Sequence, residues 1–157
     1  MARLRLCRAA VVAATLWTAT GLWHAGTPNV LAGAQAAETA SPVPPALQGV
    51  WRWVSATNGG NRLSVATPDR YTLAFPEAGR IALKADCNRA AGGVTFGDDG
   101  ALKIGPMAMT RAMCPPGSLS DRFAQDVERS TRWSIDGGAL LLSQPGGAGT
   151  LRFLRER

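Results

Sequence analysis

Hydrophobic and polar residues alternate along most of the chain from Trp51 onward. Trp51 and Trp53 share one side of an extended segment, and residues 71–75 and 81–87 repeat the same period of two. Alternation of this kind is typical of β-strands with one buried face. It predicts that Cys87 lies on the core side of its strand. Shorter alternating segments follow at 94–96, 102–104, 133–135, 140–142 and 151–153.

One segment has the period of a helix instead. Within residues 118–131, Leu119, Phe123 and Val127 are spaced four positions apart, which places them on one face of an α-helix. Ser118, which forms an S-x-x-D pattern with Asp121, is a candidate N-cap for this helix, and Ser120 is a competing one. We therefore expect a single helix inserted among the strands.

About eight short strands and one inserted helix predict a mainly β domain. The spacing fits a small antiparallel β-barrel or a strongly curled sheet filled by the helix. Residues 97–100 (GDDG) lie between two alternating segments and contain a D-G step, which indicates a hairpin. The segment Ala56–Pro68 is polar and rich in turn residues, so we expect a long surface loop there.

The first 36 residues have the pattern of a cleavable signal peptide. Three arginines within the first eight residues precede an uncharged apolar stretch at 9–23, and small residues follow up to an A-x-A site at 34–36. This pattern predicts a periplasmic or secreted protein. The apolar stretch is shorter than the roughly 20 residues that span a bilayer. An uncleaved anchor is the alternative, because the gap before the A-x-A site is long.

The remaining chain divides into an Ala/Pro-rich tether at 37–46 and a domain at 47–157. The formal charge of +6 falls to +3 without the signal, because 17 basic residues minus three leaves 14 against 11 acidic residues. The basic residues are scattered singly, whereas nucleic-acid binding needs a cluster of them. We therefore expect no nucleic-acid partner, and membrane contact only through the transient signal segment.

Candidate catalytic groups are few. The one histidine, His24, lies in the expected signal, so the mature domain lacks the imidazole that Ser-His pairs, Cys-His pairs and most zinc sites require. The chain has neither a C-x-x-C pair nor a glycine-rich phosphate-binding loop. Asp98 and Asp99 fit ordinary turn chemistry better than a metal site. We expect no enzymatic activity, no cofactor and no metal.

Export would leave Cys87 and Cys114 in a compartment where disulfides form and persist. An even pair in an exported domain is commonly bridged. The alternative is a pair of small buried hydrophobic side chains.

Two stretches, residues 86–92 (DCNRAAG) and residues 107–115 (MAMTRAMCP), resemble motifs of the META domain, the family that includes the heat-shock protein HslJ. The first stretch is similar to the family's G-C-N-x-x-x-G motif, and the second is similar to its second motif, a threonine followed by M-A-C. The order of the two motifs matches the family, and the resemblance covers roughly residues 47–155. The residues that carry it are Asp86, Cys87, Asn88, Gly92, Thr110, Met113 and Cys114.

The sequence departs from the family pattern at two of these positions. Asp86 stands where the family usually has glycine, so it must tolerate the backbone geometry that glycine adopts. Met113 follows Ala112, where the family more often has the reverse order. We interpret the motif residues as scaffold: Asn88 and Thr110 would bond to backbone groups, and Gly92 would permit a tight turn.

A Cys87–Cys114 bridge would tie the two motifs together. The resemblance also implies a compact β-barrel-like domain of exported or envelope-associated bacterial proteins, often linked to stress responses and without an established enzymatic activity. The leading hypothesis is a non-catalytic envelope protein that supports stress tolerance by binding a protein partner or a surface. One alternative is a carrier of a small ligand in the barrel interior. Another is an inhibitor of an extracellular hydrolase, acting through the segment Ala56–Pro68.

Overall fold

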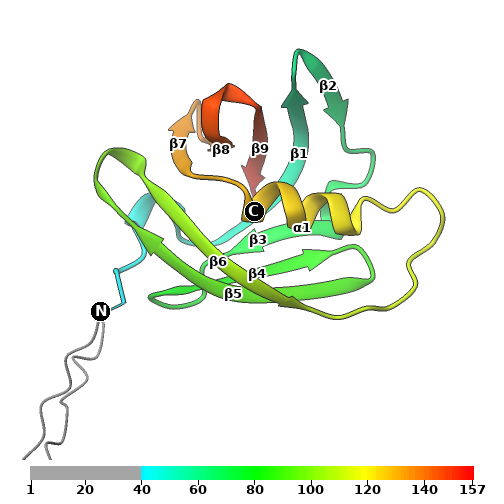
Figure 1. Cartoon of the computed structure of the whole chain (residues 1–157), viewed down its shortest axis with the longest axis horizontal. Helices are drawn as coiled ribbons and strands as arrows, with labels where there is room; N and C mark the ends of the chain where they lie inside the picture. The colour runs from blue at the N-terminus through cyan, green and yellow to red at the C-terminus, as the bar shows by residue number, and fades with distance from the viewer. Residues whose placement is uncertain (1–39) are drawn as a thin grey trace, which may run out of the picture. The chain divides into compact units, whose positions relative to one another are not determined.

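The computed structural model describes residues 40–157, which form a sheet of nine antiparallel strands and one α-helix (Figure 1). The expected signal peptide at 1–36 lies outside the described residues. No helix in the described part is long and apolar enough to cross a bilayer. The elements are β1 (Val50–Asn58), β2 (Asn61–Ser64), β3 (Tyr71–Ala74), β4 (Arg80–Ala85), β5 (Asn88–Phe96), β6 (Leu102–Met109), α1 (Ser120–Glu128), β7 (Arg132–Asp136), β8 (Ala139–Ser143) and β9 (Gly149–Arg155).

The strands follow the order β6-β5-β4-β3-β1-β9-β8-β7, and β2 pairs with the second half of β1. The sheet curls so that the starts of its two outermost strands, β6 and β7, come together. There Ala101 and Arg132 form an isolated bridge, and the amide of Leu102 donates to the carbonyl of Thr131 at 2.9 Å. The predicted mainly β, barrel-like class with one helix is confirmed, with nine strands where the pattern indicated about eight.

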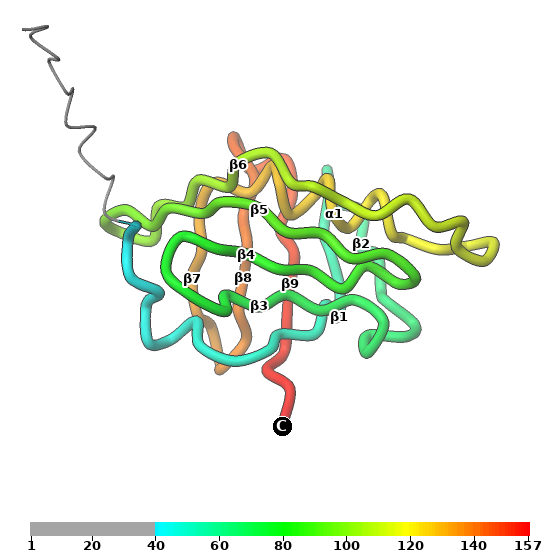
Figure 2. The backbone as a smooth tube through the Cα atoms, turned by 90° about the horizontal axis from the view of Figure 1, so that it is seen from below, coloured from blue at the N-terminus to red at the C-terminus, as the bar shows by residue number. Residues whose placement is uncertain are grey.

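Two β-bulges accompany the curl, one between Trp53 and Ser55 and one between Gly92 and Val94. In Figure 2, β3, β4 and β5 form a near layer, with β7, β8 and β9 crossing behind it. A Cβ atom at Gly92 would lie 2.8 Å from the Cγ atom of Met107, so glycine here permits the close approach of β6. The expected tight turn at Gly92 is therefore wrong, because this residue lies inside β5.

Helix α1 fills the inside of the curled sheet. Phe123 and Val127 point inward and are fully buried. The Phe123 ring stacks on Trp53 with their centroids 5.0 Å apart, and it also contacts Tyr71 and Phe153 at 5.8 and 6.1 Å. The predicted apolar helix face is thus the part of the helix that completes the core. The helix is shorter than the 118–131 segment that the pattern indicated.

Two local expectations differ from the structure. The segment Ala56–Pro68 begins with the end of β1 and the strand β2, joined by a turn in which Gly59 and Gly60 have positive φ angles of 55° and 84°. It is therefore a β-hairpin followed by a short loop. Cys87 is not on the core face but is exposed, because β4 ends at Ala85 and the chain turns there.

The described end of the expected tether packs on the domain. Val43 contacts the hydrophobic core, and Pro45–Leu47 form a short 3-10 helix in which Leu47 is fully buried. The carbonyl of Leu47 accepts a hydrogen bond from the indole N–H of Trp51 at 3.0 Å. These contacts attach the segment before β1 to the core.

Candidate functional site

The first motif begins in the two-residue turn between β4 and β5. Asp86 has a φ of 60°, so it adopts the left-handed conformation that favours glycine. Its amide donates to the carbonyl of Arg70 at 2.7 Å, and its carboxylate, only 2% exposed, contacts the Arg70 guanidinium. Asp86 therefore adopts the geometry expected for the family's glycine, and it also gains an ionic partner that glycine lacks.

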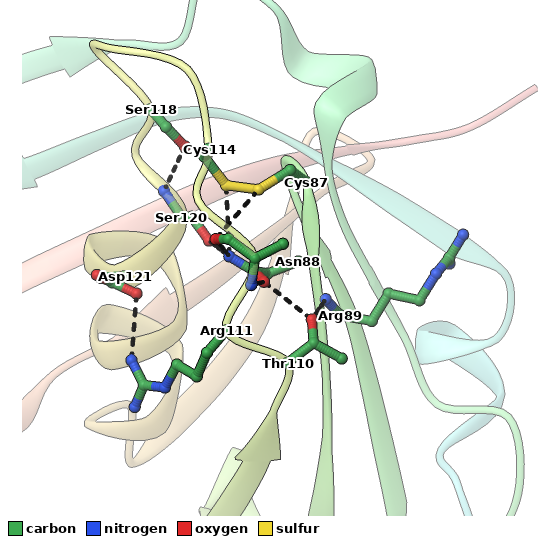
Figure 3. Close-up of polar contacts among 10 residues, drawn as sticks. Cys87, Asn88, Arg89, Thr110, Arg111, Cys114, Ser118, Ser120 and Asp121 are labelled. Carbon is green, nitrogen blue, oxygen red and sulfur yellow. Dashed lines mark hydrogen bonds and ion pairs between the residues drawn. A yellow bond between two sulfur atoms is a disulfide. The ribbon is translucent and has the colours of Figure 1, made fainter.

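The second residue of the turn, Cys87, forms a disulfide with Cys114 (Figure 3). The Cα atoms are 5.4 Å apart, and the bridge joins positions 27 residues apart in the sequence. It connects the β4–β5 turn to the loop that runs from the end of β6 to α1. The two family motifs are therefore linked covalently.

Asn88, the first residue of β5, organises the same loop (Figure 3). Asn88 is buried, with only 4% of its surface exposed to solvent. Its carbonyl oxygen accepts from the hydroxyl of Thr110 at 2.9 Å and from the amide of Ala112 at 2.8 Å. Its amide nitrogen donates to the carbonyl of Ala112 and the hydroxyl of Ser120, both at 3.2 Å, and lies 3.3 Å from the Cys114 sulfur.

The two bonds to Ala112 satisfy both its backbone N–H and its C=O group, which in a strand would pair with the neighbouring strand. Because Ala112 uses both its N–H and its C=O group, the bonds also fix which way the Asn88 amide points. The bond to Ser120 reaches the first turn of α1. A single buried side chain therefore holds β5, the loop and the helix together.

Further hydrogen bonds position both ends of the loop. The Thr110 hydroxyl accepts from the amide of Arg89 at 3.0 Å, as expected for a residue that satisfies a nearby backbone group. At the other end, the amide of Leu119 donates to the hydroxyl of Tyr71 at 3.0 Å. Neither Ser118 nor Ser120 is the N-cap residue, which is Leu119, but the Ser118 hydroxyl accepts from the amide of Ser120 at 3.3 Å.

An open depression of about 360 Å³ lies over this loop and the start of α1. Arg111 and Asp121, both exposed, are among its lining residues and form an ion pair at 3.6 Å. Met113 is 99% exposed and is not part of the Asn88 network, although it belongs to the second motif. Among residues 40–157 there is no group of three or more His, Cys, Asp or Glu side chains that could hold a metal ion. The polar atoms of the motifs are instead used in hydrogen bonds that support the loop.

The fold and the two motifs can be compared with known proteins. The profile of the META domain matches residues 45–157. The chain belongs to the META domain family. The match includes the buried Asn88, the disulfide and the helix that fills the sheet, so these are features of this META domain as a whole.

Two solved structures share the fold of this META domain. One is the NMR structure of a protein from Burkholderia xenovorans, with a TM-score of 0.56, 20% identity, and coverage of 70% of this chain and 83% of that chain. The other is a crystal structure of a DUF4847 family protein from Bacteroides vulgatus, with a TM-score of 0.53, 14% identity, and coverage of 71% and 95%. Comparison with curated proteins gives no match to this chain.

The sequence identified Asp86, Cys87, Asn88, Thr110 and Cys114, and the structure brings all five together at one end of the sheet. Gly92 lies further along β5, in the close contact with β6. Three partners were missed by sequence reasoning, and no motif marks them, because each is brought in by the packing of a distant segment. They are Arg70, Tyr71 and Ser120.

Proposed function

We propose that this META domain is a non-catalytic exported protein that supports stress tolerance of the cell envelope by binding a protein partner at its surface. One observation carries the proposal: α1 occupies the inside of the curled sheet. Phe123, packed between Trp53 and Phe153, takes the space that a carried ligand would need. An interior filled by side chains favours recognition at the outside of the molecule.

Two further observations support it. The Cys87–Cys114 disulfide is compatible with an oxidising, extracytoplasmic location. The motif residues Asn88 and Thr110 use their polar groups on backbone and side-chain partners within the domain, which fits a supporting role and not a catalytic one.

A photo-crosslinking scan in the native host tests this function. The full chain carries p-benzoylphenylalanine at one surface position at a time, namely Ala91 on β5, Arg62 on β2, Ser134 on β7 or Arg157 at the C-terminus. We expect a defined adduct with another protein from at least one position. No protein adduct from any of the four positions would contradict the proposal, and a stoichiometric small molecule on the purified chain would then favour a carrier.

A further inference from the structure

The outer face of strands β3 to β6 has an uneven distribution of charge. These strands contain four charged residues, all cations, and no acidic residue. All four side chains are on exposed residues, while their neighbours along each strand point into the core. The acidic residues nearby are confined to the turns, where Asp86 pairs with Arg70 and Glu77 pairs with Arg80 at 3.1 Å. The four cations are Arg80, Lys84, Arg89 and Lys103.

Strand register places two of these cations side by side. Lys84 on β4 lies directly opposite Arg89 on β5. Like charges directly opposite in a sheet destabilise it. Among residues 40–157, no carboxylate lies within 4.0 Å of either cation, and the Lys84 ammonium instead donates to the backbone carbonyl of Asp69 at 3.1 Å. Repulsion between them is therefore left for an external anion to relieve.

The same row continues onto the neighbouring strands. Thr72 on β3 lies opposite Lys84, and Arg52 on β1 lies opposite Thr72. Arg52 is paired with Asp69 at 2.7 Å, so the cations of this row without a carboxylate partner are Lys84 and Arg89. We call this row (Arg52, Thr72, Lys84 and Arg89), together with the neighbouring Ala74, Ala82 and Ala91, the basic face.

Beside the cations runs a row of small side chains. Ala74, Ala82 and Ala91 are in register across β3, β4 and β5, and the row ends at Val50 on β1 and Ala108 on β6. Figure 2 looks onto β3, β4 and β5, and no described segment crosses in front of them. A row of small methyl side chains lets another protein approach the strands closely, while the adjacent cations select its charge.

The side chains present favour one class of occupant. The aromatic residues of β3 to β6, Tyr71 and Phe96, pack toward the core and offer no outward ring for stacking a sugar. The alanines are too small to anchor a protein in a bilayer, which takes large apolar side chains. A second copy of the chain would bring like charges together. An acidic protein surface that also carries apolar side chains matches both the unpaired cations and the row of small apolar side chains.

We propose that the basic face is the docking surface for an acidic protein partner, whose carboxylates pair with Lys84 and Arg89 while its apolar side chains pack on Ala82 and Ala91. The assignment rests on the proposed function, because it names the surface and the chemistry of that partner.

The test combines the crosslinking scan with a charge-neutralised variant. Lys84→Gln with Arg89→Gln removes both cations and the repulsion between them, and Arg62→Gln with Arg157→Gln makes the same change in net charge elsewhere. We expect the adduct from Ala91 to fall at least about tenfold in the first variant and to remain in the second, because the carboxylates lose their partners. The urea midpoint of the first variant should equal or exceed that of the original chain, which a merely structural role of the two cations would not produce.

The outcomes separate the two proposals. An adduct from Ser134 or Arg62 but none from Ala91 overturns the basic face while leaving the partner-binding function intact. An adduct from Ala91 that survives Lys84→Gln with Arg89→Gln, or whose crosslinked segment is not acidic, also overturns it. Binding of the purified protein to phosphatidylglycerol vesicles or to alginate, without a protein adduct, would assign the cations to a lipid or polysaccharide surface instead. No protein adduct from any position contradicts the function itself.

Discussion

At the residue scale, Asn88 is the side chain on which most of the site depends. It is buried, and it joins the disulfide loop to α1 through hydrogen bonds to Ala112 and Ser120. Replacing it would leave several of these groups unpaired in a buried place, which costs more than the bonds themselves contribute. The stability and the geometry of the loop therefore depend on the side-chain amide of Asn88.

We predict that Asn88→Ala lowers the free energy of unfolding by about 2–4 kcal/mol, because buried donors and acceptors lose their partner. Urea unfolding of the oxidised protein measures the change. The matched control is Asn61→Ala in the exposed β1–β2 hairpin, which should stay within about 0.5 kcal/mol of the original chain. Equal midpoints for the two variants would show that the network contributes nothing to stability.

Two substitutions at Asp86 separate the contribution of its backbone conformation to stability from the contribution of its carboxylate. Asp86→Gly and Asp86→Ala both remove the carboxylate that contacts Arg70, but only glycine adopts a φ of 60° without strain. We expect the glycine variant to be more stable than the alanine variant by about 1 kcal/mol. Urea unfolding of the two variants side by side gives the difference. An alanine variant as stable as the glycine variant would mean that the turn relaxes away from this geometry.

At the scale of elements, α1 determines what the sheet can enclose. Its inward face packs Phe123 against three aromatic rings from β1, β3 and β9. The curled sheet therefore has a solid interior, and its shape depends on the helix remaining in place.

Phe123→Ala should lower the free energy of unfolding by about 3–5 kcal/mol, because it removes a fully buried ring and leaves a cavity. Gln125→Ala, at an exposed position of the same helix, is the control and should change stability by less than about 0.5 kcal/mol. Thermal unfolding followed by near-ultraviolet circular dichroism reports both stability and aromatic packing. A Phe123→Ala protein that unfolds like the control would show that α1 is not part of the core.

Sequence periodicity predicted those elements that bury one face, since only these leave a pattern of hydrophobic residues. The strands around Trp51, Tyr71 and Leu83 and the helix around Phe123 were found in this way. Strand β2 was missed because it is polar and exposed on nearly all of its length. The role of Gly92 was misread because the need for glycine comes from the register of β6, which the local sequence does not contain.

The candidate site was predictable to the extent that its residues belong to motifs. Cysteine number and the expected compartment indicated the bridge, and the family resemblance indicated Asn88 and Thr110. Tyr71 and Ser120 could not be predicted as partners, because their positions depend on how β3 and α1 pack against the loop. The basic face was also hidden, since Lys84 and Arg89 look like scattered charges until the strands are paired.

At the scale of the whole molecule, the disulfide closes a long segment that contains β5 and β6. Cys87→Ser with Cys114→Ser should lower the free energy of unfolding by about 3 kcal/mol, because the unfolded chain regains the freedom that the bridge removes. The urea midpoint with and without dithiothreitol checks this. Reductant should shift the original chain and leave the double variant unchanged, and a midpoint that is insensitive to both changes would contradict the prediction.

The domain has an interior filled by side chains, and the central proposal is that it binds a partner at its outer surface after export. Native mass spectrometry of the protein taken from the host envelope, without reduction or refolding, tests this most directly. The predicted result is a chain that begins near Ala37, lacks two hydrogens, and is bound to a protein partner without a small molecule. A chain that carries a stoichiometric small molecule and no protein partner would contradict it.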